Sequence, residues 1–296
     1  MGYGNYTSKD WSLLKTSRNI NEKSNVNEIF SKGFSDKYDP RYISVRESRE
    51  SAEHPLSTPI IIGLDDTASM GYLSERIATT ALNETMMKLY SENVVPNPQL
   101  MFAFYGDEGD SHPLQVTQFE SDIRIAEQLM ELKFENHGHG CVVPSLLWLF
   151  ADKFVVTDKW EKHHEKGFIF TIGDSAAVRP AAKDSFIDQT FGVNRVKFGL
   201  FQRFLNVDNI IKETGQKFEM FHFIICSKNE YGNLNRWNAL YGRTVMLQRT
   251  EIDCIPELII SIIQYTLGAD KSEILKQSES DYKREVVEKA LNGLKI

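Results

Sequence analysis

Three side chains with hard oxygen atoms, Asp65, Thr67 and Ser69, stand two residues apart along the chain. They follow an apolar run, residues 60–64, of the kind that forms a strand buried on both faces of a parallel sheet. The carboxyl end of such a strand is where open α/β sheets bind ligands. One carboxylate and two hydroxyls would make a site that suits Mg²⁺, with water or a partner in the remaining positions. The alternative is a strand-to-helix turn in which Thr67 or Ser69 caps the next helix.

The motif Asp-x-Thr-x-Ser-Met-Gly at residues 65–71 resembles the metal-ion-dependent adhesion site (MIDAS) of von Willebrand factor A (vWA) domains. That site has the pattern Asp-x-Ser-x-Ser, so Thr67 is the one departure within it. An amphipathic stretch from about residue 72 to 93 follows, in the vWA order. Residues 166–174, Lys-Gly-Phe-Ile-Phe-Thr-Ile-Gly-Asp, look like the vWA strand that delivers the distal MIDAS aspartate.

The resemblance extends over most of the chain, from about residue 28 to 267. More narrowly, residues 57–65 and 114–129 are similar to segments of a bacterial and phage family of free-standing vWA proteins. The resemblance implies an α/β, Rossmann-like vWA domain. Its sheet would be mostly parallel and six-stranded, with one antiparallel edge strand and helices on both faces.

The same resemblance implies a metal site and a kind of partner. Asp65, Thr67, Ser69 and, through water, Asp174 would hold Mg²⁺, or Mn²⁺ or Ca²⁺ in its place. A Glu or Asp carboxylate of a protein partner would complete the coordination. For intracellular vWA proteins of bacteria and phages, the partner is often an AAA+ ATPase of the MoxR type or a component of an assembly.

The middle MIDAS element departs from the family pattern. In the Gly-rich loop at residues 136–145, Cys141 stands about where the family places a Thr. A neutral thiol is a poor ligand for Mg²⁺. The site lacks that ligand, or Ser145 substitutes for it, or water fills the place. Because His137, His139 and Cys141 alternate in the same loop, zinc is a further alternative.

Other polar residues near these motifs have structural explanations. Asp66 is expected to face solvent beside the motif, as a minor candidate ligand that adds negative potential. The acids of the loop at residues 107–110 either rim the same face or simply form a turn. His163 and His164 are expected at the solvated end of a helix.

Short apolar runs alternate with longer amphipathic ones from Pro59 onward, which is typical of repeated βα units. The predicted strands are 60–64, 100–105, 115–119, 168–172, 218–225 and 244–247. The predicted helices are 72–92, 121–133, 144–154, 207–214, 254–267 and a very polar 271–294. The expected organisation is an N-terminal arm (residues 1–56) with a short strand within 42–48, a vWA domain (57–268) and a C-terminal polar helix (269–296).

Composition narrows the function. A net charge of −7 argues against a general nucleic-acid surface, which needs a basic patch. Three widely spaced cysteines suit a reducing compartment. Neither a signal peptide nor a membrane span is expected, since the most apolar C-terminal stretch, 255–267, is far shorter than the ~20 residues a span needs. The expected location is the cytoplasm, or a virion if a phage encodes the chain.

No nucleophile–base pair and no phosphate-binding glycine loop is evident in the sequence. The favoured function is therefore metal-dependent protein binding without catalysis, in an intracellular or phage assembly. One alternative is a Mg²⁺-dependent phosphohydrolase that uses Asp65 and Asp174. Another is a structural or virion component whose MIDAS has decayed, which Cys141 would favour.

Overall fold

The computed structural model describes residues 4–135, 142–174, 182–196, 204–226 and 243–295. Within these ranges, the main sheet has six strands in the order β10-β9-β6-β2-β3-β4. All neighbouring pairs are parallel except β3 and β4, which form an antiparallel pair at one edge. The predicted fold class, an α/β fold with a mostly parallel six-stranded sheet and one antiparallel edge strand, is confirmed. The strands are β2 (Thr58–Asp65), β3 (Pro98–Tyr105), β4 (Leu114–Val116), β6 (Gly167–Gly173), β9 (Phe218–Cys226) and β10 (Thr244–Gln248).

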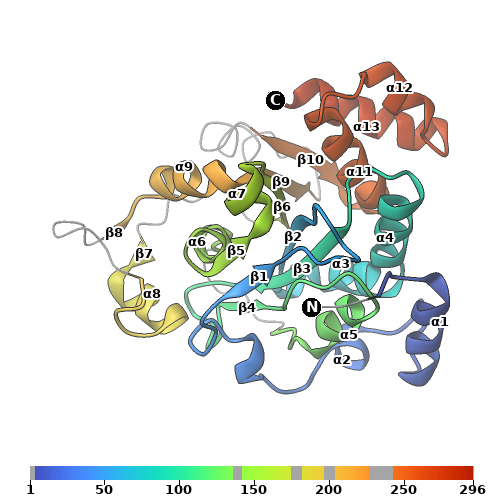
Figure 1. Ribbon diagram of the computed structural model, residues 1–296. Helices are drawn as coiled ribbons and strands as arrows, with labels where there is room; N and C mark the ends of the chain where they lie inside the picture. Colours follow the sequence, from blue (N-terminus) through green and yellow to red (C-terminus); the bar gives the residue numbers. More distant parts are fainter. Residues whose placement is uncertain (1–3, 136–141, 175–181, 197–203, 227–242, 296) are drawn as a thin grey trace.

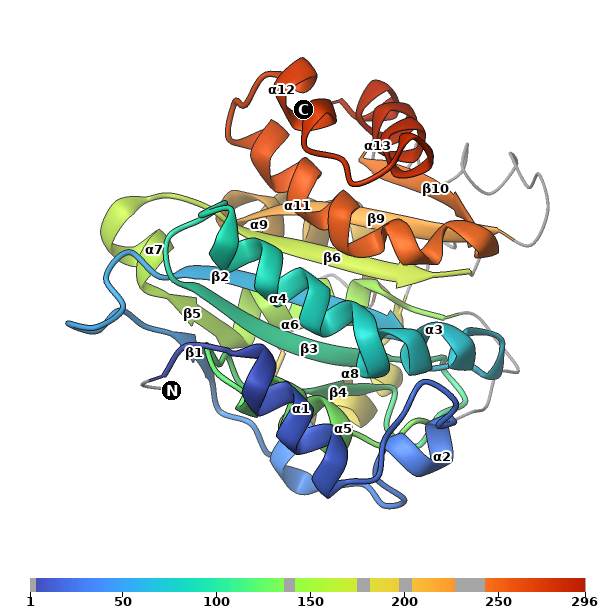
Figure 2. The same cartoon turned by 90° about the vertical axis from the view of Figure 1, so that its right-hand side faces the viewer.

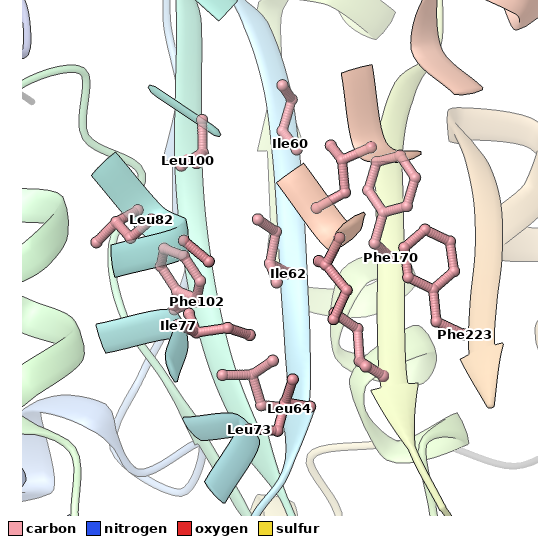
Figure 3. Packing of buried hydrophobic residues seen from close by; sticks show 14 of the residues in the cluster. Ile60, Ile62, Leu64, Leu73, Ile77, Leu82, Leu100, Phe102, Phe170 and Phe223 are labelled. Atoms are coloured by element: carbon pink, nitrogen blue, oxygen red, sulfur yellow. The ribbon is translucent and has the colours of Figure 1, made fainter. Parts of the chain in front are cut away.

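Helices cover both faces of this sheet, because alternate residues of each central strand point to opposite sides. In β2, Ile60, Ile62 and Leu64 belong to one buried cluster and Ile61 to another. Figure 3 shows the first cluster, in which side chains of β2 and β3 meet Leu73, Ile77 and Leu82 of the neighbouring helix. A strand buried on both faces reads as a continuous apolar run, and this explains why β2 was recognisable in the sequence.

The helices that cover each face of the sheet come from separate parts of the chain (Figures 1 and 2). The first face carries α3 (Gly71–Arg76), η3 (Ile77–Ala81), α4 (Leu82–Ser91), α5 (Arg124–Glu131) and α11 (Ile255–Thr266). The second face carries α6 (Ser145–Phe154), α8 (Asp184–Phe191) and α9 (Val207–Lys217). Two short strands, β7 (Ala182–Lys183) just before α8 and β8 (Phe204–Leu205) just before α9, form an antiparallel pair.

The helix predicted at residues 72–92 is continuous, but its middle segment, η3, is a π-helical turn. A π turn widens the helix and changes the partners of its carbonyl groups. Here Lys15 of the N-terminal helix α1 (Ser8–Ser17) donates a hydrogen bond from Nζ to the Thr79 carbonyl, at 3.1 Å. The N-terminal segment therefore contacts the helix that follows the candidate motif.

The N-terminal residues pack against the first face of the sheet. Besides α1, which the sequence analysis did not predict, they form α2 (Val26–Ile29) and η1 (Asp36–Tyr38). Trp11, Ile29 and Tyr38 lie in the same buried cluster as β2. The strand expected within residues 42–48 is β1 (Arg46–Ser48), which pairs in parallel with β5 (Val155–Thr157). The helix α7 (Asp158–His163) follows β5, and His163 and His164 lie at its exposed end, as expected.

The single C-terminal helix predicted at residues 271–294 is wrong. Two helices, α12 (Lys271–Lys276) and α13 (Asp281–Gly293), occupy the segment. The break occurs because the Ser280 side chain accepts a hydrogen bond from the Lys283 amide and so begins a new helix. Val286, Val287, Ala290 and Leu291 are the buried residues of α13. Among the described residues, no helix is long and apolar enough to cross a membrane.

Candidate metal-binding site

Asp65 is the last residue of β2 and lies in the middle of the sheet's carboxyl edge. Its backbone is paired with Tyr105 of β3, while the preceding residue, Leu64, is paired with Ile172 of β6. The Asp65 side chain is completely buried. A buried carboxylate must be paired or hydrogen-bonded, so the question is which groups surround it.

Thr67 and Ser69 bring two more oxygen atoms to Asp65. Asp65 Oδ1 accepts hydrogen bonds from the Thr67 amide at 2.9 Å and from the Thr67 hydroxyl at 2.5 Å. The hydroxyls of Thr67 and Ser69 are 3.2 Å apart. Neither hydroxyl caps the helical turns that follow, η2 (Ala68–Met70) and α3, so the capping alternative is not observed.

Gly173, the last residue of β6, holds the backbone close to Asp65. A Cβ atom at this position would lie 2.9 Å from Asp65 Oδ2 and 2.9 Å from the Tyr105 hydroxyl. That hydroxyl in turn donates a hydrogen bond to the Ile172 carbonyl, at 2.9 Å. Glycine is therefore required for the close approach of β6 to the aspartate, and it places the next residue, Asp174, at the same edge.

Asp174 has a cationic neighbour that the sequence analysis missed. Arg249 begins η4 (Arg249–Cys254), directly after β10, and its Nη2 lies 3.8 Å from Asp174 Oδ2. The guanidinium group stacks over the Tyr72 ring, 4.9 Å from its centroid. Burial raises the pKa of Tyr72 to about 12; the Arg249 charge lowers it, while Asp174 and Asp65 raise it. The charges of Arg249 and of both candidate metal-binding carboxylates therefore act on the Tyr72 phenol.

Asp66 does not face solvent, and that expectation is wrong. The residue is 1% exposed, and its amide donates a hydrogen bond to the Tyr105 carbonyl at 3.2 Å. Burial raises the pKa of its carboxyl well above the usual range, and the charges of Asp65, Asp110 and Glu135 raise it further. The shift of this pKa favours the neutral carboxyl over the carboxylate.

The loop after β3 covers Asp66, and local hydrogen bonds hold that loop. Asp110 Oδ2 accepts from the Asp107 amide at 2.7 Å, and Asp107 Oδ1 accepts from the Gly109 amide at 2.6 Å. A Cβ at Gly106 would lie 2.1 Å from Asp110 Oδ2 and 2.8 Å from Asp66 Oδ1, so the two carboxyl groups approach the same glycine. Glu108 is exposed. The residues of this loop form a turn that shields the Asp66 carboxyl from solvent.

The middle MIDAS element is only partly described. Cys141, His137 and His139 lie outside the described residues, so the thiol and zinc alternatives stay open. Ser145 is the first residue of α6 and is buried. Just before it, the Val143 amide donates a hydrogen bond to the Gly106 carbonyl at 3.1 Å. The start of α6 therefore adjoins the loop after β3.

The donors that meet at Asp65 fit a hard divalent cation. They are oxygen atoms only, and two of the three belong to neutral hydroxyls, as Mg²⁺ accepts when water completes its shell. For Thr67 Oγ1 to bind a cation, its hydroxyl hydrogen would turn away from Asp65. Among the described residues, no group of three or more His, Cys, Asp or Glu side chains is arranged to hold a metal, so the site depends on its hydroxyls.

A surface cavity of about 520 Å³ lies elsewhere, among residues of the N-terminal segment and α5. Arg18, Ile29, Tyr38 and Glu131 are among its lining residues, and none of the lining residues belongs to the candidate metal site.

Comparisons with known proteins add little beyond the fold. No protein-family model and no curated protein matches the chain. Among solved structures, the chain is similar to the pilus adhesin SpaC from Lactobacillus rhamnosus GG, with a TM-score of 0.45 and 7% identity over 75% of this chain. It is also similar to the vWF domain of the type V pili tip protein Mfa5 from Porphyromonas gingivalis, with a TM-score of 0.42 and 8% identity over 77% of this chain. The chain spans 31% of the SpaC chain and 98% of the Mfa5 domain. Likenesses this distant carry no information about metal, activity or partner.

Proposed function

We propose that the chain is a metal-ion-dependent protein-binding module that works without catalytic turnover. A divalent cation, Mg²⁺ or in its place Mn²⁺ or Ca²⁺, would be held by Asp65, Thr67 and Ser69, with Asp174 acting through water. When bound, the cation would supply an electrophilic position for an acidic side chain of a partner. The partner would be an assembly component or an AAA+ ATPase of the MoxR type, in the cytoplasm or in a virion.

One observation carries this proposal. The side-chain oxygens of Thr67 and Ser69 are linked to the buried Asp65 carboxylate at the carboxyl edge of the sheet, rather than to a helix cap. Hydroxyls used in this way leave most of the cation's charge uncompensated, and a cation with few anionic ligands attracts another carboxylate.

The test is chelator-sensitive association measured with matched variants. The immobilised protein would be incubated with native lysate of its source in Mg²⁺ or in EDTA, and retained proteins would be identified by mass spectrometry. We expect a partner that is retained in Mg²⁺, lost in EDTA, and lost in Asp65→Asn and Thr67→Ala. Asp65→Asn keeps an oxygen acceptor for the Thr67 amide, so it removes charge with little change in local structure.

The control is Asp208→Asn, which removes a carboxylate from an exposed position at the start of α9. This variant should retain the partner like the wild type. A partner that survives EDTA and both site substitutions would contradict the proposal and favour a structural role for the chain.

A further inference from the structure

Arg249 occupies an unusual place for a cation, beside a carboxylate that is expected to help hold a metal. Its guanidinium is 3.8 Å from Asp174 Oδ2, and the Arg249 side chain is 46% exposed while that of Asp174 is 22% exposed. An ion pair of this length at the surface is weak, because water screens both charges. The guanidinium can therefore donate hydrogen bonds to another group without losing a strong interaction with Asp174.

Two features fix where the Arg249 guanidinium lies. Its backbone begins η4, where the Gln248 amide donates a hydrogen bond to Glu251 Oε2 at 2.7 Å. Its side chain lies over the Tyr72 ring, with the guanidinium carbon 4.9 Å from the ring centroid. Stacking of a guanidinium on an aromatic face orients its planar fork and leaves its edge N–H groups available as donors.

The phenol of Tyr72 lies at the same edge, under the Arg249 guanidinium. Tyr72 Oη is buried and makes no hydrogen bond with any described residue. Burial raises the pKa of this phenol, the Arg249 charge lowers it, and the Asp174 and Asp65 charges raise it, so the phenol lies within electrostatic reach of all three groups. Arg249, whose side chain is 46% exposed, presents its N–H donors at the rim of the site beside Asp174, and the buried Tyr72 supports it from below the guanidinium.

We propose that Arg249 is a second anchor for the partner's acidic side chain. The inference rests on the proposed function, in which that carboxylate completes the coordination of a cation at Asp65, Thr67 and Ser69. One carboxylate oxygen would face the cation, and the guanidinium would donate to the other oxygen. The planar fork of arginine matches a carboxylate, and such charge-assisted hydrogen bonds are stronger than neutral ones.

Arg249 should have opposite effects on the metal and on the carboxylate. A positive charge beside Asp174 repels a divalent cation, so its removal should tighten metal binding. The same removal should weaken binding of a carboxylate to the metal-loaded protein. A residue that only neutralised Asp174 would show the first effect without the second, so the pair of measurements is diagnostic.

The probe is a short blocked peptide, acetyl-Gly-Glu-Gly-amide, added to the full chain loaded with Mn²⁺. Paramagnetic broadening of the Glu methylene signals in NMR spectra reports binding next to the ion, and acetyl-Gly-Gln-Gly-amide shows the background. Mn²⁺ affinity is measured separately from the signal of the free ion in electron paramagnetic resonance. For Arg249→Gln we expect tighter Mn²⁺ binding and a roughly tenfold weaker Glu-peptide affinity, as for loss of one hydrogen bond to a charged group. Arg249→Lys should recover part of the peptide affinity, because it restores charge without the planar fork.

The matched control is Arg76→Gln. Arg76 lies on α3, and its Nε is 2.6 Å from Asp253 Oδ1. Asp253 belongs to η4, the short helix that Arg249 begins. This variant should bind Mn²⁺ and the Glu peptide like the wild type. If Arg249→Gln binds Mn²⁺ and has the wild-type peptide affinity, the second-anchor inference is wrong while the metal site stands. If the wild type binds no Mn²⁺, both the proposed function and the inference fall.

Discussion

Gly173 is the residue on which the geometry of the candidate site depends most closely. A side chain there would collide with two groups that are themselves completely buried, the Asp65 carboxylate and the Tyr105 hydroxyl. Neither group can move without disturbing the hydrogen bonds of Thr67 to Asp65 or of Tyr105 to Ile172. The glycine thus links the packing of β2, β3 and β6 to the position of the candidate ligands.

Gly173→Ala should therefore destabilise the fold and weaken metal binding together. We expect a loss of about 1–3 kcal/mol in the free energy of unfolding, the usual cost of overpacking a buried site. Urea denaturation measures it. The control is Gly215→Ala in α9, where an added Cβ would meet no atom within 4 Å, and which should gain about 0.5–1 kcal/mol. Equal stability of the wild type and Gly173→Ala would show that a methyl group fits between β6, the Asp65 carboxylate and the Tyr105 hydroxyl, contrary to the close contacts at Gly173.

Asp66 and Arg249 mark what residue-level reasoning missed. Asp66 was expected to face solvent beside the motif, whereas it is 1% exposed. Its burial depends on the loop after β3, a long-range contact with no local signal in the sequence. Arg249 did have a signal, because it directly follows a parallel strand, β10, at the same sheet edge as Asp65. The partnership with Tyr72 had none.

At the scale of elements, a buried histidine joins the central strands. His222 of β9 is paired in register with Thr171 of β6, and their side chains meet with His222 Nδ1 2.9 Å from Thr171 Oγ1. Burial lowers the pKa of His222 to about 3. The imidazole is therefore neutral in the folded protein across the range in which an exposed histidine becomes charged.

This difference predicts a pH dependence of stability. Below about pH 6.5 the unfolded chain takes up a proton at His222 and the folded chain does not, so stability falls as the pH drops towards 3. The slope attributable to this residue is at most about 1.4 kcal/mol per pH unit. Urea denaturation at several pH values should show that His222→Gln loses less stability than the wild type between pH 6 and pH 4. Parallel curves for the two proteins would contradict the assignment.

The C-terminal helix α13 is packed against the domain rather than projecting from it. Val287 is completely buried, and Glu257 of α11 has Lys88 of α4 at 3.9 Å and Lys283 of α13 at 3.6 Å. Lys88 also pairs with Glu279 at 2.9 Å, and the hydrogen bonds of Lys283 and Lys88 lower the pKa of Glu279 to about 2. The sequence had left open whether this polar segment packs by one narrow apolar stripe or projects as an arm, and the buried residues of α13 form such a stripe.

Val287→Ala tests the packing of α13. We expect a loss of about 1–3 kcal/mol in the free energy of unfolding, from lost burial and a residual cavity. Glu288→Ala, on the exposed side of the same helix, should change stability far less, because its side chain is 52% exposed. A projecting arm would give the same small effect for both variants, and that result would overturn the described packing.

At the scale of the whole molecule, the sequence predicted the sheet well and the periphery poorly. Strands β2, β3, β6 and β9 are nearly continuous apolar runs, so their identity followed from local pattern. The order of the strands in the sheet was not predicted. Helix α1 was not predicted, since its buried face consists of Trp11 and Leu14 alone. The break between α12 and α13 depends on a single cap at Ser280. The oxygen cluster at Asp65 was found because its residues adjoin in sequence; its neighbours from β3, β6 and β10 become visible only when the sheet is assembled.

The proposed function depends on a divalent cation held by Asp65, Thr67 and Ser69. A protein with a net charge of −7 binds cations weakly at many surface acids, so the measurement must separate the site from this background. The most direct one is a Mn²⁺ titration followed by electron paramagnetic resonance of the free ion, on the wild type, Asp65→Asn and Asp208→Asn. We predict one saturable Mn²⁺ per chain, displaced by Mg²⁺, that is retained in Asp208→Asn and lost in Asp65→Asn while that variant keeps its cooperative urea transition. Identical saturable binding by the wild type and Asp65→Asn would contradict the claim.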